Sequence, residues 1–69
     1  MTLIYKSLYR STEDGNWQAG ESREREVTAD QFEDMKANSK LVGMTYSEKY
    51  NEFFMIHTDR LHATKITVR

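Results

Sequence analysis

Two histidines near the C-terminal end have the clearest metal-binding potential in this sequence. His57 and His62 flank Asp59-Arg60, and a hairpin loop at that dipeptide would make the two histidines neighbours on adjacent strands. Their Cβ atoms would then lie about 5 Å apart, close enough for both imidazoles to bind one metal ion. A structural zinc site needs four protein ligands, however, and the chain has no cysteine and no third histidine. We therefore expect no metal and no cofactor, and a half-buried histidine pair hydrogen-bonded to Thr58 or Thr64.

The acidic stretch from residue 13 to residue 34 is the second candidate for a functional surface. It carries eight Asp and Glu residues against only Arg23 and Arg25, whereas the rest of the chain is basic and the net charge is -1. Such a stretch could dock a basic protein surface, including one that normally holds nucleic acid, because complementary charge steers encounter and sets specificity. The expected contact residues are Trp17, Glu24, Glu26, Asp30, Glu33 and Asp34.

The same acidic residues have a structural explanation that needs no partner. The three acids between residues 30 and 34 fall in the first turns of a predicted helix, where the macrodipole favours negative side chains by about 0.3 to 1 kcal/mol each. Glu24 and Glu26 are two residues apart on a predicted strand, so they point to one face while Arg23 and Arg25 point to the other. A solvated acidic surface is therefore the alternative to a docking surface.

Trp17 has two interpretations, because it follows a turn in an otherwise polar segment. It is either the lid of a small core or an exposed anchor of the kind that dominates protein interfaces.

Nucleic-acid binding is the alternative function. Tyr5 and Tyr9 lie close in sequence to Lys6 and Arg10, and stacking surfaces need aromatic and basic side chains together. On a strand, however, the two tyrosines point to the opposite face from those two bases. A small regulator that binds nucleic acid through the basic C-terminal strand, with Lys65 and Arg69, would bind more weakly as salt increases.

Catalysis is not expected from this sequence. The chain has no nucleophile motif, no glycine-rich phosphate loop and no metal-ligand spacing, and 69 residues offer little volume for a pocket. We expect a non-enzymatic protein-binding module. Its size also suits a phage or mobile-element accessory protein that inhibits a host protein or defence complex, which is a hypothesis from size alone.

The first half of the chain predicts two strands. Residues 2–10 read as a strand, and Asp14-Gly15 predicts a tight turn in which Gly15 takes a positive φ. Only the end of the following polar stretch, about 22–27, looks extended, with Gly20 as a bulge or loop residue. The alternating charges of 22–27 are typical of an exposed edge strand, where they oppose edge-to-edge aggregation.

The central segment predicts one short helix with a well-marked beginning. Thr28 and Gln31 have the spacing of a capping box, and Val27 and Phe32 have that of a hydrophobic staple. The helix should run from residue 29 to about residue 37 and end at Asn38 in a left-handed conformation. So short a helix must pack on a sheet to be stable.

The second half of the chain predicts three strands, at residues 40–47, 52–58 and 61–69, with a turn at 48–51. The fold class is then α+β: a mainly antiparallel sheet of four or five strands with one helix, in the order β-β-α-β-β-β. In the last hairpin one face carries Phe53, Met55, Ile66 and Val68, and the other carries Phe54, Ile56, Leu61 and Ala63. One short helix covers only one face, so the other must meet another part of the chain or a partner, such as a second copy bound through a sheet face or edge.

Composition sets the broad class of the molecule. The length of 69 residues corresponds to a single small domain, and 12% aromatic content favours a packed core. The absence of cysteine suits a reducing compartment, and no stretch approaches the roughly 20 apolar residues of a membrane span. We therefore expect a soluble cytoplasmic protein with no membrane contact.

Overall fold

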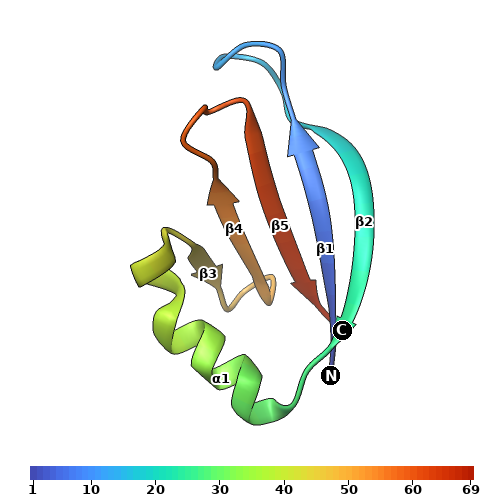
Figure 1. Ribbon diagram of the computed structural model, residues 1–69, viewed down its shortest axis with the longest axis vertical. Helices are drawn as coiled ribbons and strands as arrows, with labels where there is room; N and C mark the ends of the chain where they lie inside the picture. Colours follow the sequence, from blue (N-terminus) through green and yellow to red (C-terminus); the bar gives the residue numbers. More distant parts are fainter.

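The computed structural model describes all of residues 1–69 and contains one five-stranded antiparallel sheet (Figure 1). The elements are β1 (Thr2–Tyr9), β2 (Gln18–Glu26), α1 (Ala29–Asn38), the 3-10 helix η1 (Ser39–Val42), β3 (Thr45–Ser47), β4 (Glu52–Ile56) and β5 (His62–Val68). Across the sheet the strand order is β2-β1-β5-β4-β3. The α+β fold class and the order of elements predicted from the sequence are confirmed.

The hydrophobic core lies between α1 and one face of the sheet. It contains Leu3, Val27, Phe32, Phe53 and Ile66, all at least nine-tenths buried. The ring of Phe32 on α1 packs edge-on against that of Phe53, with centroids 5.9 Å apart. The predicted pairing of His57 with His62 in the last hairpin is confirmed, since the N–H of His57 donates to the carbonyl of His62, and the same register places Phe53 opposite Ile66. In Figure 1, α1 lies at the lower end of the sheet beside β3, so the upper ends of β4 and β5 extend beyond it.

Both ends of α1 lie within one residue of their predicted positions, but the helix does not end in the predicted conformation. The backbone N–H of Gln31 donates to the Thr28 hydroxyl (3.1 Å), and the N–H of Thr28 donates to the Gln31 side chain (2.9 Å). Asn38 was expected to be left-handed but has φ -98°, and its side chain donates to the carbonyl of Asp34. The chain continues as η1 until Gly43, whose φ of 79° ends it. The predicted strand over 40–47 is therefore wrong in its first half, because the helical path does not stop until Gly43.

A bulge interrupts the hairpin of β1 and β2 near Gly20, as the sequence predicts. The pairing passes from Lys6 opposite Ser22 to Leu8 opposite Ala19. A side chain at position 20 would meet the carbonyl of Ser7 at 3.3 Å, so glycine fits this close approach. β2 begins at Gln18, earlier than expected.

The turn before β2 exists, but its conformation differs from the prediction. The N–H of Gly15 donates to the carbonyl of Thr12 (3.0 Å), and Gly15 does not adopt the expected positive φ. The connection between Tyr9 and Gln18 is much longer than a two-residue hairpin turn, so it does not need the mirror-image turn that requires a positive φ.

The second face of the sheet is partly covered by the chain itself. The Trp17 ring packs edge-on against Phe54, with centroids 6.2 Å apart, and the guanidinium of Arg10 lies 4.1 Å from the centroid of the Trp17 ring. Ala63, on this face of β5, is 2% exposed. Ile56, further along the same face, remains half exposed. Trp17 therefore acts as a lid over a small second cluster.

Candidate partner-binding edge

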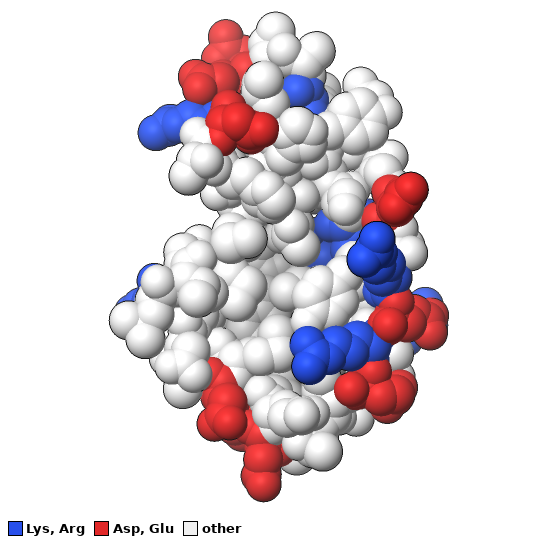
Figure 2. Space-filling model, in the orientation of Figure 1, with Lys and Arg blue, Asp and Glu red and all other residues white.

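The acidic residues expected to form a contact surface lie on two different elements. Glu24 and Glu26 are on β2 and point away from the α1 side of the sheet, whereas Asp30, Glu33 and Asp34 are on α1. On the face shown in Figure 2, acidic side chains gather over the upper loops, along the β2 side and over the lower end, with no single acidic patch. The charge imbalance along the sequence is therefore divided among several parts of the surface.

Three of these acids have a basic group nearby. Glu33 accepts from Lys36 at 2.8 Å, and this hydrogen bond raises the pKa of Lys36. Glu24 lies 3.9 Å from a guanidinium nitrogen of Arg69, and Glu26 lies 3.8 Å from the N-terminal amine. Pairs this exposed typically contribute 0 to about 1 kcal/mol, so they leave these carboxylates free to meet other cations.

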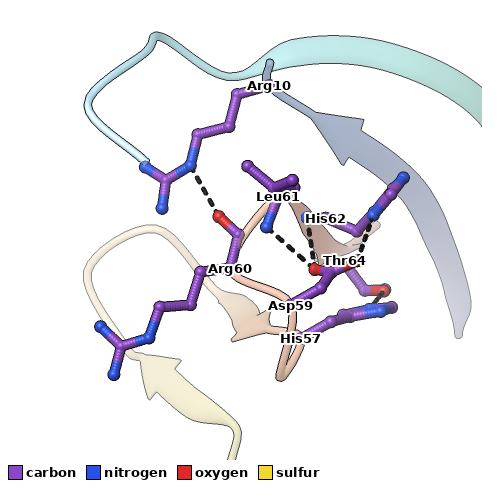
Figure 3. Close-up of polar contacts among 7 residues, drawn as sticks. All are labelled: Arg10, His57, Asp59, Arg60, Leu61, His62 and Thr64. Carbon is purple, nitrogen blue, oxygen red and sulfur yellow. Dashed lines mark hydrogen bonds and ion pairs between the residues drawn. The ribbon is translucent and has the colours of Figure 1, made fainter. Parts of the chain in front are cut away.

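The two histidines have separate partners in the β4–β5 hairpin (Figure 3). Nε2 of His57 lies 2.9 Å from the Thr64 hydroxyl, as expected from the sequence, whereas Nδ1 of His62 lies 2.7 Å from Oδ2 of Asp59. Both residues are exposed, which corrects the prediction of a half-buried pair, because the hairpin extends beyond the cover of α1. No three His, Asp or Glu side chains gather in a metal-binding arrangement.

Asp59 organises the loop of that hairpin. Its Oδ1 accepts from the backbone N–H groups of Leu61 (2.9 Å) and His62 (3.1 Å). The hydrogen bond from the His62 ring, followed by that from the Leu61 backbone, lowers the pKa of Asp59. The tip is also joined to the other hairpin, because Nε of Arg10 donates to the carbonyl of Arg60 at 2.9 Å.

The longest open edge of the sheet is β2. All nine of its residues are exposed, and its only neighbour is β1. Met1 and Val27 exchange two backbone hydrogen bonds (2.8 and 2.9 Å), which fixes the alternation of the antiparallel ladder. Arg23 and Arg25 must then turn their backbone groups towards β1. Ser22, Glu24 and Glu26 turn their N–H and C=O groups outward, where no strand receives them.

From Ser22 to Glu26, each face of this edge carries one sign of charge. Arg25 is opposite the buried Leu3, so Arg23 and Arg25 lie on the α1 side, and Glu24 and Glu26 lie on the other side, as the sequence predicts. Neither arginine forms an ion pair within the chain. Figure 2 shows basic and acidic side chains interleaved along the β2 side of the molecule.

Sequence reasoning missed the position of Arg23 next to Tyr5. The two residues are opposite each other on β2 and β1, and together with Ser7, Glu21, Glu24, Arg25 and Thr64 they line a shallow hollow of about 560 Å³. Within one strand, Tyr5 and its basic neighbours point to opposite faces, so only the pairing of β1 with β2 brings an aromatic ring and arginines together. Because the bulge near Gly20 shifts the register, the residue opposite Tyr5 could not be predicted by counting from the turn.

The opposite end of the sheet exposes apolar side chains. β3 pairs with β4 only from Glu52 to Phe54, so the last two residues of β4 lie at an edge. Leu41 and Val42 on η1 are 83% and 57% exposed. Figure 2 shows a notch on this side of the molecule, bordered by uncharged atoms.

Comparison with protein-family models, curated proteins and solved structures finds no match to this chain. No helix in the structure has the length and apolar character needed to cross a bilayer.

Proposed function

We propose that this chain is a non-enzymatic protein-binding module that docks an extended segment of a partner along the β2 edge. The observation that supports this function is the open edge of β2, where all nine residues are exposed and the backbone groups of Ser22, Glu24 and Glu26 face outward without a partner strand. Addition of a strand to an exposed sheet edge is a common mode of peptide recognition, in which backbone hydrogen bonds provide affinity and side chains provide specificity. Occupying such a segment of a host protein is also how an accessory inhibitor of this size could act.

Small-molecule binding has less support from the surface. The largest hollow is shallow, and Tyr5 is its only hydrophobic lining residue. Pockets for small ligands are mostly apolar and enclose most of the ligand. The hollow adjoins β2, so we interpret it as part of the docking surface.

Proline at position 24 tests the edge directly. The N–H of Glu24 points outward, so Glu24→Pro removes a docking donor and keeps the hydrogen bonds between β1 and β2. Glu24→Gln keeps the donor and removes only the charge. Ten-residue peptides would be selected from a random displayed library on the wild-type protein, and their Kd values measured on all three proteins.

We expect the selected peptides to lose binding to Glu24→Pro and to retain it on Glu24→Gln. Circular dichroism should show that both variants keep the fold. Upon peptide binding, the amides of Ser22 and Glu26 should exchange hydrogen more slowly. Peptides that bind Glu24→Pro as tightly as the wild type would place recognition elsewhere and overturn the proposal.

Nucleic-acid binding is a second candidate because Tyr5 lies beside Arg23 and Arg25. An aromatic ring with basic neighbours can stack a base and neutralise its phosphate. Lys65 and Arg69, expected to serve this function, instead lie near the carboxylates of Glu52 (3.5 Å) and Glu24 (3.9 Å). This function predicts binding of oligothymidylate that weakens steeply with salt and is lost in Arg23→Ala. No binding at low salt would remove it.

A further inference from the structure

We propose that the segment docked on β2 is a strand of alternating charge from another protein, with acidic residues on the α1 side of the sheet and basic residues on the other side. This inference rests on the proposed edge docking and specifies its partner. Three features of the edge support it. The charges are separated by face, the outward backbone groups have a defined direction, and the same charge pattern would repel a second copy of this chain.

The separation of charge by face defines what a partner must present. A strand bound to β2 continues the sheet, so each of its side chains lies beside a β2 side chain on the same face. Arg23 and Arg25 have no acidic partner within the chain, and the nearest cations to Glu24 and Glu26 are 3.8 to 3.9 Å away at exposed positions. Acids beside the arginines and bases beside the glutamates would complete all four positions.

The direction of the backbone groups fixes the register. In an antiparallel arrangement the partner residue opposite Glu24 forms the hydrogen-bonded pair, and its two neighbours face Arg23 and Arg25 in non-hydrogen-bonded pairs. Side chains approach more closely in non-hydrogen-bonded pairs. The centre of the partner segment should therefore read acidic, basic, acidic. The bulge near Gly20 bends the strand, so the matched stretch runs from Ser22 to Glu26.

A second copy of this chain does not fit the pattern. Two β2 edges related by a two-fold axis pair in an antiparallel arrangement, with the same face of each sheet on the same side. Two residues that face each other must then lie on the same face of the strand, so odd positions face odd positions. When the axis passes at position 24, Arg23 of one copy faces Arg25 of the other, and Glu24 faces Glu24. Shifting by one step along the ladder places Arg25 opposite itself. Like charges directly opposite are destabilising, so the stretch from Ser22 to Glu26 disfavours pairing with its own copy.

Three synthetic ten-residue peptides would test the pattern. The first alternates Lys and Glu, the second has the same composition with all Lys before all Glu, and the third alternates Thr and Val. Binding would be followed by amide chemical shifts at low ionic strength. We expect the alternating peptide to bind the wild type about tenfold more tightly than the block peptide, as expected from several cross-strand charge pairs acting together.

Charge-reversed edges provide matched controls. In Arg23→Glu with Arg25→Glu both faces are acidic, so the preference for the alternating peptide should disappear. Adding Glu24→Arg and Glu26→Arg to that variant inverts both faces, and the alternating peptide should bind again after shifting by one residue. If the arginines only attracted negative charge from a distance, the fourfold variant would not regain binding of the alternating peptide.

The outcomes separate this inference from the function on which it rests. If the three peptides bind the wild type equally and Glu24→Pro abolishes all binding, the edge docks strands but the charge pattern is wrong. If Glu24→Pro leaves the binding of the alternating peptide unchanged, the edge itself is the wrong site. If no peptide causes shifts in the wild type at millimolar concentration, both proposals are overturned.

Discussion

At the scale of single residues, Asp59 provides a pH-dependent contribution to stability. The hydrogen bonds from the His62 ring and the Leu61 backbone favour its charged form, so its pKa in the folded state lies below the ordinary value of 3.8. A carboxyl group of this kind stabilises the fold at pH values above its unfolded pKa. That stabilisation is lost as pH falls through the lowered folded pKa.

Asp59→Asn tests this dependence, because the amide oxygen still accepts from the backbone while the charge is removed. The melting temperature of the wild type should fall more steeply between pH 5 and about 2 than that of the variant. The two proteins should have the same fold by circular dichroism at pH 6. Parallel pH profiles would show that the carboxylate charge contributes nothing to the hairpin.

Trp17 is the residue whose interpretation the structure changes most. It covers the second face through Phe54 on one side and Arg10 on the other. We expect Trp17→Ala to lower the free energy of unfolding by about 1 to 3 kcal/mol, because it removes an aromatic pair, a cation-π contact and buried area. Trp17→Phe should lose less. Urea unfolding followed by circular dichroism would measure both, and an unchanged midpoint for the alanine variant would contradict the role as a lid.

At the scale of elements, the sequence predicted those features that depend on neighbouring residues. The capping box at Thr28 and Gln31 was readable because its parts are three residues apart. The register of the last hairpin followed from the position of its loop. The length of β2 could not be predicted, because residues 18–21 are Gln, Ala, Gly and Glu, of which the last three have low strand propensity, and they become a strand only by pairing with β1. The position of Arg23 beside Tyr5 was missed for the same reason.

The position of the end of α1 was predicted to within one residue, but the left-handed conformation was assigned to Asn38 and not to Gly43. The side-chain amide of Asn38 donates to the carbonyl of Asp34, and the residue with the left-handed conformation is Gly43. Gly43→Ala should therefore destabilise the protein by about 1 kcal/mol. Since no atom lies within 4 Å of the added Cβ, the cost is conformational. Gly43→Asn should cost less, because asparagine tolerates this conformation better than alanine. Equal thermal stability of Gly43→Ala and the wild type would contradict this assignment.

At the scale of the whole molecule, a small core and a long open edge are related features. Only seven residues are buried, so few apolar contacts stabilise the fold. Any ligand that binds only the folded state therefore adds to its stability. A partner strand on β2 would widen the sheet from five strands to six and protect backbone groups that now face solvent. We expect binding of such a strand to raise the melting temperature, and the rise should continue with the logarithm of the strand concentration above its Kd.

The charge pattern of β2 also predicts how the assembly state can be changed by one residue. With the two-fold axis at position 24, Arg25 of each copy faces Arg23 of the other. Arg25→Glu converts both of these repulsive pairs into attractive ones, and it is not expected to disturb folding because Arg25 is exposed and has no ion pair within the chain. We expect this variant to form a dimer whose population increases with concentration and decreases with salt.

Arg25→Gln separates the two effects, because it removes the repulsion and adds no attraction. Sedimentation equilibrium at low and high salt should then rank the tendency to dimerise as Arg25→Glu, Arg25→Gln, wild type. A dimer of Arg25→Glu that persists at high salt, or that survives addition of Glu24→Pro, would have to use another surface, since proline at position 24 removes the central hydrogen bonds of this edge. A wild-type dimer that Glu24→Pro dissociates would show that the like charges do not prevent self-pairing, and the partner strand would then need no complementary pattern.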